Sequence, residues 1–331
     1  MTGTETVQSF NTLNYSGLLY NKADTSTPFL NLIGGNVKYT NSVEFVCGQY
    51  YTSEEGVIPA ISETASLTAP DATFVTRSQL SNVTQIFMES VAISYAKQSN
   101  MATLSGVNIA NQTANPQDEL DFQVARKMEK IKRSIEKTFI QGTYNKAAAD
   151  NQINKTRGML AAITTNVVAA SGAALDLWLL NDSVAGIKSN GGDIDNLYAF
   201  VNTNNLLQVN GNAIEMWLPI GAAKDTEYGV QVRDVILPIG ATIKLVIGAF
   251  IPDGTALIFN PKYIGPVEQP VPAKGNFFLE ELAKTGAGAK YQIFGQIGLD
   301  HGPEWYAAKI TGLSTTFTAP VGQKVVTVAS A

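Results

Sequence analysis

The chain has 331 residues and a formal net charge of −5 at pH 7, and only 15% of its residues are charged. Soluble domains usually carry charge on about 25% of their residues, so a monomer of this composition would have little electrostatic protection against association. We therefore expect much of its surface to be buried between subunits. The acidic balance also argues against nucleic acid as the main partner, because such a partner is usually held on a basic face.

Cysteine usage and hydropathy exclude several other classes. Cys47 is the only cysteine, so no intrachain disulfide can form, and no CxxC motif or Cys/His cluster indicates a metal site. We expect Cys47 to be a small buried apolar residue. The first 20 residues show no basic region followed by an apolar core, so we predict no secretory signal. The most apolar stretch, residues 235–251, is interrupted by proline, glycine and lysine, so we predict no membrane-spanning segment.

Residues 1–40 are mostly polar and have no regular period, which predicts an extended arm that becomes ordered by lying on another surface. Residues 15–21 are compatible with a short helix. The scattered apolar residues that would anchor this arm are Phe10, Leu18, Leu19, Phe29, Leu30, Leu32 and Ile33.

The next segment alternates as a strand does, with Val43, Phe45 and Cys47 on one side. A long, turn-rich polar segment follows, and extended runs return at residues 74–77 and 83–95. Two strands joined by so long a loop would be unusual inside a compact domain. We therefore predict a projecting hairpin that is stabilised by neighbouring subunits.

One long amphipathic helix is predicted between Asn115 and Gly142. Its apolar side chains recur at spacings of three and four on one face, at Leu120, Val124, Met128, Ile131, Ile135 and Phe139. Asn115 suits the N-cap, Pro116 suits the first helical position, and Gly142 supplies the stop. Acidic residues crowd the first turns and basic residues follow, as the helix dipole favours. Because acids are interleaved, we interpret the basic run as a solvated face and not as a nucleic-acid patch.

After this helix, the segment RGMLAAITTN (residues 157–166) predicts a turn into a short buried segment. Residues 160–250 alternate helical and extended patterns, which predicts a compact α/β region. Its predicted helices are at 175–188 and 203–216, and its predicted strands are at 197–201, 230–235 and 242–246. From residue 254 the chain is rich in strands, which we expect to pack on the long helix. Residues 323–328 alternate like an edge strand.

No residue pattern indicates catalysis or a bound cofactor or metal. His301 is the only histidine, so a multi-histidine metal site is excluded, and we interpret it as a structural residue more readily than as a lone general base. The glycine-rich segment 285–290 lacks the spacing and the following helix of a phosphate-binding loop, so we predict a hairpin turn there. Glu54 and Glu55 lie in the long loop, where paired acids are usually solvated. We therefore predict no catalytic, cofactor-binding or metal-binding residue and no enzymatic activity.

The order of these elements resembles that of tailed-bacteriophage major capsid proteins with the HK97-type fold. The resemblance covers nearly the whole chain. Its most specific segments are SNVTQIFMESVAIS (81–94), IEKTFIQG (135–142), RGMLAAITTN (157–166) and LAKTGAGAKYQIFGQIGLDHGPEWYAAKITGL (282–313).

The resemblance implies an α+β, HK97-like capsid fold in five parts. These are an N-terminal arm at 1–40, an extended E-loop hairpin at 41–95, a P-domain at 96–154 with its spine helix at 116–141, an inserted A-domain at 155–253, and P-domain return strands with a C-terminal tail at 254–331.

The function that the resemblance implies is self-assembly into hexamers and pentamers, which form the icosahedral head around packaged double-stranded DNA. The implied partners are copies of the chain, the portal protein and a separate scaffolding protein, while a decoration protein is left open. The packaged DNA would be contacted only weakly, and no membrane would be contacted. The protein would be found in the virion, after assembly in the cytoplasm of the host bacterium.

Two alternatives are left open by the sequence. An encapsulin-type nanocompartment shell protein shares the fold and would be distinguished by a cargo-docking peptide on a neighbouring enzyme. An unrelated enzyme or carbohydrate-binding β-protein would instead be a monomer with a saturable ligand. Some relatives of the phage family join an E-loop lysine to an asparagine in a neighbouring subunit, but residues 41–80 contain no lysine, so we expect no such cross-link.

Overall fold

The computed structural model describes residues 26–54, 56–69, 71–96, 119–215, 225–227, 230–284 and 286–316. These residues form two compact units. The described part of the first unit lies within residues 89–131 and 279–293, and that of the second within residues 26–88, 132–278 and 294–316. The predictions for Asn115, Pro116, residues 15–21 and residues 323–328 fall outside the described residues.

The long helix α3 (Glu119–Gln141) is present where it was predicted and ends immediately before Gly142. Its apolar stripe is most deeply buried at Ile131, Ile135 and Phe139, which are 3%, 5% and 0% exposed. This burial confirms that the spacing of three and four marks the face that packs on the rest of the protein.

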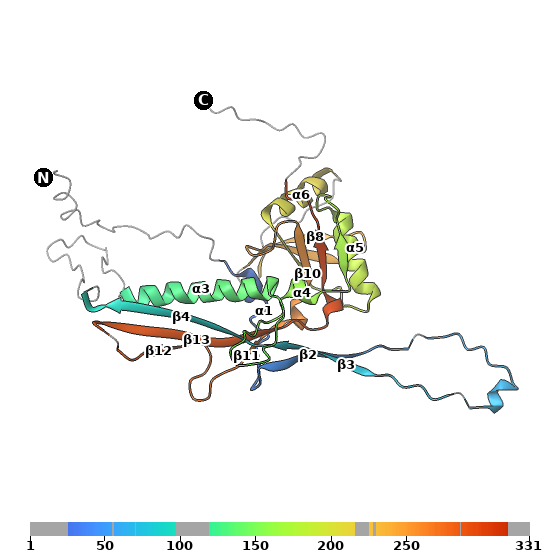
Figure 1. The fold of residues 1–331 in the computed structure, drawn as a ribbon. Helices are drawn as coiled ribbons and strands as arrows, with labels where there is room; N and C mark the ends of the chain where they lie inside the picture. The colour runs from blue at the N-terminus through green and yellow to red at the C-terminus, as the bar shows by residue number, and fades with distance from the viewer. Residues whose placement is uncertain are drawn as a thin grey trace, which may run out of the picture. The chain divides into compact units, whose positions relative to one another are not determined.

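In the first unit, ion pairs join α3 to β4 (Gln85–Ser94), and the two run beside each other (Figure 1). Lys127 Nζ lies 2.9 Å from Glu89 Oε2, and Lys130 also pairs with this carboxylate. Hydrogen bonds from Lys130 and then Lys127 hold the pKa of Glu89 below its usual value, although burial opposes them. The basic face of the helix is therefore partly used in holding a strand.

A sheet of extended strands includes β4. Its order is β1 (Lys38–Tyr39), β11 (Gly265–Glu268), β13 (Gly288–Asp300) and β12 (Phe278–Glu281), with β4 also paired to β13. Leu282 N donates to Lys290 O at 2.8 Å, so β12 and β13 close a hairpin around the glycine-rich segment, as predicted. Thr285, within that turn, lies outside the described residues.

The predicted projecting hairpin is formed by β2 (Glu44–Tyr51) and β3 (Arg77–Val83), which pair antiparallel with a bulge between Val46 and Gly48. The second strand differs from the prediction, which placed extended runs at 74–77 and 83–95. The structure pairs the polar residues between them, because ladder hydrogen bonds come from the backbone and need no apolar alternation. Apart from the 3₁₀ turn Ala65–Leu67, no helix or strand lies among the described residues of the loop.

The second unit also holds a seven-stranded sheet in the order β5-β14-β10-β6-β9-β8-β7. Its β6–β9 and β14–β5 pairs are parallel, and the other pairs are antiparallel. The strands are β5 (Val167–Ala169), β6 (Leu197–Val201), β7 (Asp225–Glu227), β8 (Val230–Ile236), β9 (Thr242–Ile247), β10 (Thr255–Phe259) and β14 (Ala308–Thr311). The strands predicted at 197–201, 230–235 and 242–246 are confirmed.

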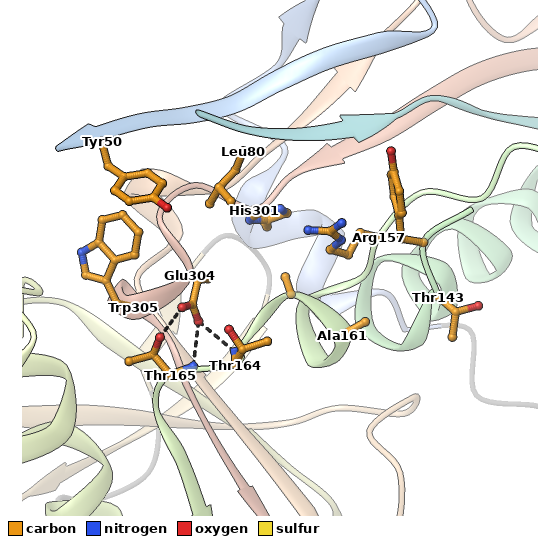
Figure 2. A pocket seen from close by; sticks show the side chains of 12 residues that line it. Tyr50, Leu80, Thr143, Arg157, Ala161, Thr164, Thr165, His301, Glu304 and Trp305 are labelled. Atoms are coloured by element: carbon orange, nitrogen blue, oxygen red, sulfur yellow. Dashed lines mark hydrogen bonds between the residues drawn. The ribbon is translucent and has the colours of Figure 1, made fainter. Parts of the chain in front are cut away.

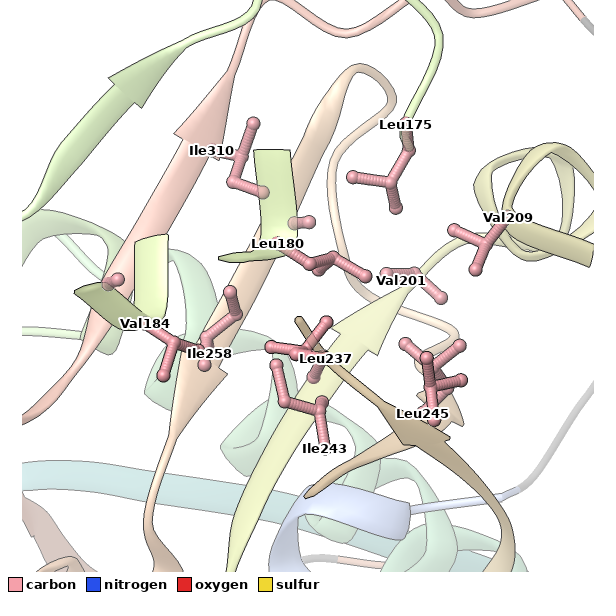
Figure 3. Packing of buried hydrophobic residues seen from close by; sticks show 14 of the residues in the cluster. Leu175, Leu180, Val184, Val201, Val209, Leu237, Ile243, Leu245, Ile258 and Ile310 are labelled. Atoms are coloured by element: carbon pink, nitrogen blue, oxygen red, sulfur yellow. The ribbon is translucent and has the colours of Figure 1, made fainter. Parts of the chain in front are cut away.

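The helices α5 (Leu177–Ser189) and α6 (Thr203–Glu215) pack on one face of this sheet, and both were predicted to within two residues. Figure 3 shows Leu180 and Val184 of α5 over Ile258 of β10, within one continuous apolar core. Asp176 caps α5 by accepting a hydrogen bond from Leu179 N at 2.8 Å. The sequence analysis placed the start of this helix at residue 175 and did not identify Asp176 as its cap.

The opposite face of the sheet is covered by α1 (Pro28–Ile33), a helix that the sequence analysis did not predict. The Phe29 ring lies 5.8 Å from that of Phe200 and 5.1 Å from that of Phe259, centroid to centroid. Strands β6 and β10 are consequently buried on both faces. A six-residue helix has no persistent period, and its stability comes from this aromatic packing.

The boundary predicted at residues 253 and 254 does not separate the sheets. Strands β10 and β14 come after that boundary, yet both belong to the same sheet as β6 and β9. Apolar strands of similar length carry no mark of the sheet they join, because strand pairing is decided between distant segments. The chain therefore adds one more strand to this sheet directly after residue 254 and returns to it once more, at β14.

Three short helices connect these layers: α4 (Met159–Ala162), η2 (Pro261–Tyr263) and η3 (Glu304–Tyr306). Helix α4 begins the short buried segment predicted at 157–166, and Met159 and Ile163 are 1% and 0% exposed. Within the described ranges, every helix is too short or too polar to span a bilayer.

Two glycines let the segment before α4 approach the end of α3. Gly158 N donates to Gly142 O at 2.9 Å, and a Cβ on Gly158 would lie 2.5 Å from Gly142 N and 2.7 Å from Thr138 O. Both obstructing atoms belong to the backbone, so only a movement of the chain could make room. Glycine at 158 is thus required for packing.

We predict that Gly158→Ala lowers the free energy of unfolding by about 1–3 kcal/mol, the usual effect of overpacking. Urea unfolding of the unassembled chain, followed by circular dichroism, would measure it. Gly35→Ala is the matched control, because a Cβ there meets no atom within 4 Å. Equal stability of the two variants would contradict the prediction.

Candidate functional site

A cavity of about 700 Å³ lies in the second unit, between the base of the β2–β3 hairpin and the segments around α4 and η3 (Figure 2). The side chains that define its walls are Tyr50 and Leu80 of the hairpin, Arg157 and Ala161 near α4, and His301 and Trp305 near η3. Three segments that are distant in sequence therefore meet at one concave surface.

A buried amide fixes these segments beside the cavity. Asn82 is 0% exposed, and its Nδ2 donates to Leu299 O at 2.8 Å and to Arg157 O at 3.1 Å. Its Oδ1 accepts from Arg157 N at 2.7 Å and from Val83 N at 2.9 Å. Both donor hydrogens and both acceptor positions of the amide are used. The hairpin, β13 and the segment before α4 are thereby held in one arrangement.

Arg157 is a half-buried cation in the cavity wall. Its guanidinium carbon lies 4.5 Å from the centroid of the Tyr144 ring, a cation–π geometry. No carboxylate among the described residues forms an ion pair with it. Within the described part of the chain, its positive charge therefore lines the cavity without a carboxylate to neutralise it.

Glu304, on the same cavity, is already satisfied. Its carboxylate accepts hydrogen bonds from Thr164 N at 2.8 Å and Thr165 N at 3.0 Å, and from the Thr165 hydroxyl (Figure 2). Burial alone would raise the pKa of Glu304, but these hydrogen bonds outweigh it and lower the pKa. Glu304 therefore anchors η3 to the segment after α4.

His301 lines the cavity but is only 2% exposed. Its Nδ1 lies 2.8 Å from Gly302 O, so Nδ1 must carry the proton and donate. Burial lowers the pKa of His301, so the ring is neutral at pH 7 and its Nε2 is an acceptor. This Nε2 has no partner among the described residues. The interpretation of His301 as a structural residue stays a prediction.

The other residues considered from sequence are separate from this cavity. Cys47 is buried as expected, at 5% exposed, and burial raises the pKa of its thiol to about 12. Glu54 is exposed in the hairpin loop, and Glu55 lies outside the described residues. Among the described residues, no three His, Cys, Asp or Glu side chains gather closely enough to hold a metal ion.

A second candidate surface was missed by the sequence analysis, which treated the hairpin loop as polar. Every described residue between Tyr51 and Gln79 is exposed. The exposed fraction reaches 82% for Val57, 91% for Ile58 and 88% for Phe74. Clustered apolar side chains of this kind usually mark an interaction surface. The presence of these apolar residues in a turn-rich segment was the sequence signal that could have identified the surface.

A long helix beside extended strands, a projecting apolar hairpin and a separate α/β layer define the HK97-type class of capsid-shell proteins. A family model described as SU10 major capsid protein matches residues 2–314, and the chain belongs to this family. It is a phage major capsid protein, a structural component of the virion. No curated protein sequence matches it.

Solved structures share the fold. The capsid of cyanophage A-1(L) has 11% identity and a TM-score of 0.64, over 92% of this chain and 98% of that one. The SrpI encapsulin of Synechococcus elongatus PCC 7942 has 11% identity and a TM-score of 0.61, over 94% and 96% of the two chains. The capsid of a native GTA particle has 15% identity and a TM-score of 0.55, over 90% and 94%. At such identities the likeness shows the fold alone.

We predict that Asn82→Ala destabilises the chain by about 3 kcal/mol or more, because it leaves several buried backbone groups without partners. Chemical denaturation of the unassembled chain would measure the loss. Gln79→Ala, at an exposed position of the same strand, should change stability by less than about 0.5 kcal/mol. A loss at position 82 no larger than that at position 79 would refute the role of the amide.

The lowered pKa of Glu304 predicts a pH-dependent contribution to stability. Because the folded state favours the ionised carboxylate, this contribution is present above the unfolded-state pKa near 4.5 and is lost as the pH falls through the lower folded-state pKa. Glu304→Gln should therefore cost about 1 kcal/mol at pH 7, allowing for partial exposure, and progressively less below pH 4.5.

Urea unfolding across pH 3–7 would test this dependence on pH. The exposed loop residue Glu63 provides a control, since Glu63→Gln removes the same charge where no such hydrogen bonds form. A cost of Glu304→Gln that did not change with pH would count against the assignment.

Proposed function

We propose that copies of this chain assemble into hexamers and pentamers that form the icosahedral head of a tailed, double-stranded DNA phage. The observation that carries the proposal is the family match across residues 2–314. The capsid of cyanophage A-1(L), with the same fold over almost the whole chain, supports it.

The surface chemistry agrees with a protein that is stable as part of an assembly. Charged residues are scarce, and the hairpin loop exposes several large apolar side chains. Burying these side chains against neighbouring subunits would contribute about 25 cal/mol for each Å² of apolar surface removed from water. Each contact can be weak, because a closed shell repeats it in every subunit and the contacts act together.

We assign the parts of the chain by their likeness to the family fold. Residues 1–40 are the N-terminal arm, residues 41–95 contain the E-loop, and α3 is the spine helix of the P-domain. The A-domain is the seven-stranded sheet with α5 and α6, so it includes β10 and β14 as well as most of residues 155–253. We propose that this A-domain lies at the axis of each hexamer or pentamer.

The remaining partners are inferred from the same role. The chain would contact the portal protein and a separate scaffolding protein, and a decoration protein is an additional candidate. Its net charge of −5 suits an inner wall that holds packaged DNA weakly. Assembly would take place in the cytoplasm of the host bacterium. The protein would have no catalytic activity and would need no cofactor or metal.

An encapsulin-type nanocompartment is the alternative, because an encapsulin shares the fold at a TM-score of 0.61. The fold cannot separate the two roles, but the family that matches this chain is one of phage capsid proteins. A peptide on a neighbouring enzyme that docks inside the shell would favour the encapsulin role.

The first test is negative-stain electron microscopy with light scattering on the purified full chain, with and without its neighbouring gene products. We expect closed shells, or rings that become shells when a scaffolding protein is added. A chain that stays monomeric under all these conditions would contradict the proposal.

Assembled particles should contain no covalent link between subunits through the hairpin loop, since residues 41–80 hold no lysine. Boiled particles should therefore run as a single band near 35.4 kDa on a reducing SDS gel. A ladder of covalent oligomers would overturn this prediction.

A further inference from the structure

The cavity of Figure 2 combines a positive charge with apolar surface. Arg157 presents a half-buried positive charge, and the one carboxylate in the cavity wall, Glu304, is occupied by hydrogen bonds from Thr164 and Thr165. Leu80 and Trp305 provide apolar surface close by. A partly desolvated cation without a counter-ion is unfavourable, so an incoming carboxylate would be favoured at Arg157.

His301 adds no further requirement, because its Nε2, which has no partner among the described residues, is buried beneath the surface of the cavity. The occupant should therefore carry a carboxylate and an apolar side chain within a short distance of one another.

The hairpin loop has this combination. Residues 52–76 contain four acidic residues and no lysine, arginine or histidine. The sequence SEEGVI, residues 53–58, places a hydroxyl, two carboxylates and two branched apolar side chains within six positions. Val57 and Ile58 are 82% and 91% exposed, and Glu54 is exposed as well. The two surfaces are complementary in charge and in apolar character.

Residues 53–58 do not occupy the cavity of their own chain. Pairing of β2 with β3 continues to Tyr51 and Arg77, and the loop leads away beyond that pair (Figure 1). Tyr50 is itself part of the cavity wall, so residues 53–58 would have to reverse immediately to enter the cavity of their own chain. Their high exposure shows that they do not do so.

We propose that the cavity beside Arg157 is the docking site for residues 53–58 of the hairpin loop of another subunit. A carboxylate of the Glu54–Glu55 pair binds Arg157, and Ile58 packs against Leu80 and Trp305. The inference rests on the proposed self-assembly and identifies one contact between its subunits. Since the cavity has walls from both the hairpin and the body of the unit, an occupied cavity also holds the receiving hairpin.

A charge exchange tests the pairing in assembled particles. Arg157→Glu, and separately Glu54→Lys with Glu55→Lys, should each lower the yield of shells about tenfold or more, since one interfacial charge pair is worth at least 1.4 kcal/mol. All three substitutions on one chain should restore the yield to within about threefold, because the pair is re-formed with its signs reversed.

The matched control is Glu63→Lys with Asp71→Lys, which makes the same change of charge in the same loop. It should leave the yield of shells within about threefold of that of the unaltered chain, because solvent and salt screen charges that lie away from the proposed contact. A triple variant no better than Arg157→Glu alone, or a control as damaging as the Glu54 and Glu55 changes, would overturn the proposal.

A second measurement locates the binding site on the unaltered chain, so it holds even if Arg157→Glu does not fold, and it uses the neutral variant Arg157→Gln only for comparison. A synthetic peptide of residues 51–60, with Ile58→p-benzoylphenylalanine, is irradiated with the unassembled full chain and the labelled peptides are identified by mass spectrometry. Labelling should fall on Leu80 or on residues 157–165 or 301–305, and it should be at least tenfold weaker in Arg157→Gln. Labelling elsewhere would contradict the site.

This design separates the two proposals. A chain that never forms shells but is labelled at the cavity would contradict the proposed function and leave the docking site standing. Shells that form normally while the peptide labels another surface would contradict the docking site alone.

Discussion

The arrangement of the second unit depends on the four hydrogen bonds of one buried amide. Asn82 lies near the end of β3. Its side chain is hydrogen-bonded to the backbone of Arg157, just before α4, and to the backbone of Leu299, near the end of β13. Among the described residues, these three segments do not share a helix or a pair of hydrogen-bonded strands. A buried amide with every position used is strongly directional, whereas apolar packing alone would tolerate sliding.

Close backbone contacts reinforce the same junction. Gly142 ends α3 and meets Gly158, and Thr156 between them accepts a hydrogen bond from Leu299 N at 3.1 Å. The end of the long helix is thus tied to the strand that Asn82 also holds. The cavity lies beside this junction, with Arg157 in its wall.

The loop of the hairpin has the opposite character. Its described residues are all exposed, its large apolar side chains have no cover, and its charge is wholly acidic. Exposure of these apolar side chains to water is unfavourable in an isolated chain. The same side chains would be buried in an assembly in which neighbouring copies contact the loop. The same contrast explains why the fold can serve both phage heads and encapsulins. A shell needs geometry and complementary surfaces, and neither role needs a reactive centre in the subunit.

Local signals in the sequence determined the long helices and several strands. The apolar period and the stop at Gly142 located α3, the helical pattern of residues 175–188 located α5, and the run 197–201 located β6, because such patterns repeat within a few residues. Tertiary structure alone decided the rest. Helix α1 exists because Phe29 packs on Phe200 and Phe259, and β10 and β14 join the α/β sheet through pairings with distant strands. The cavity combines three remote segments, and whether Arg157 has a counter-ion depends on which side chains surround it in space. Contacts between distant residues leave no periodic trace in the sequence, so only the folded chain could reveal them.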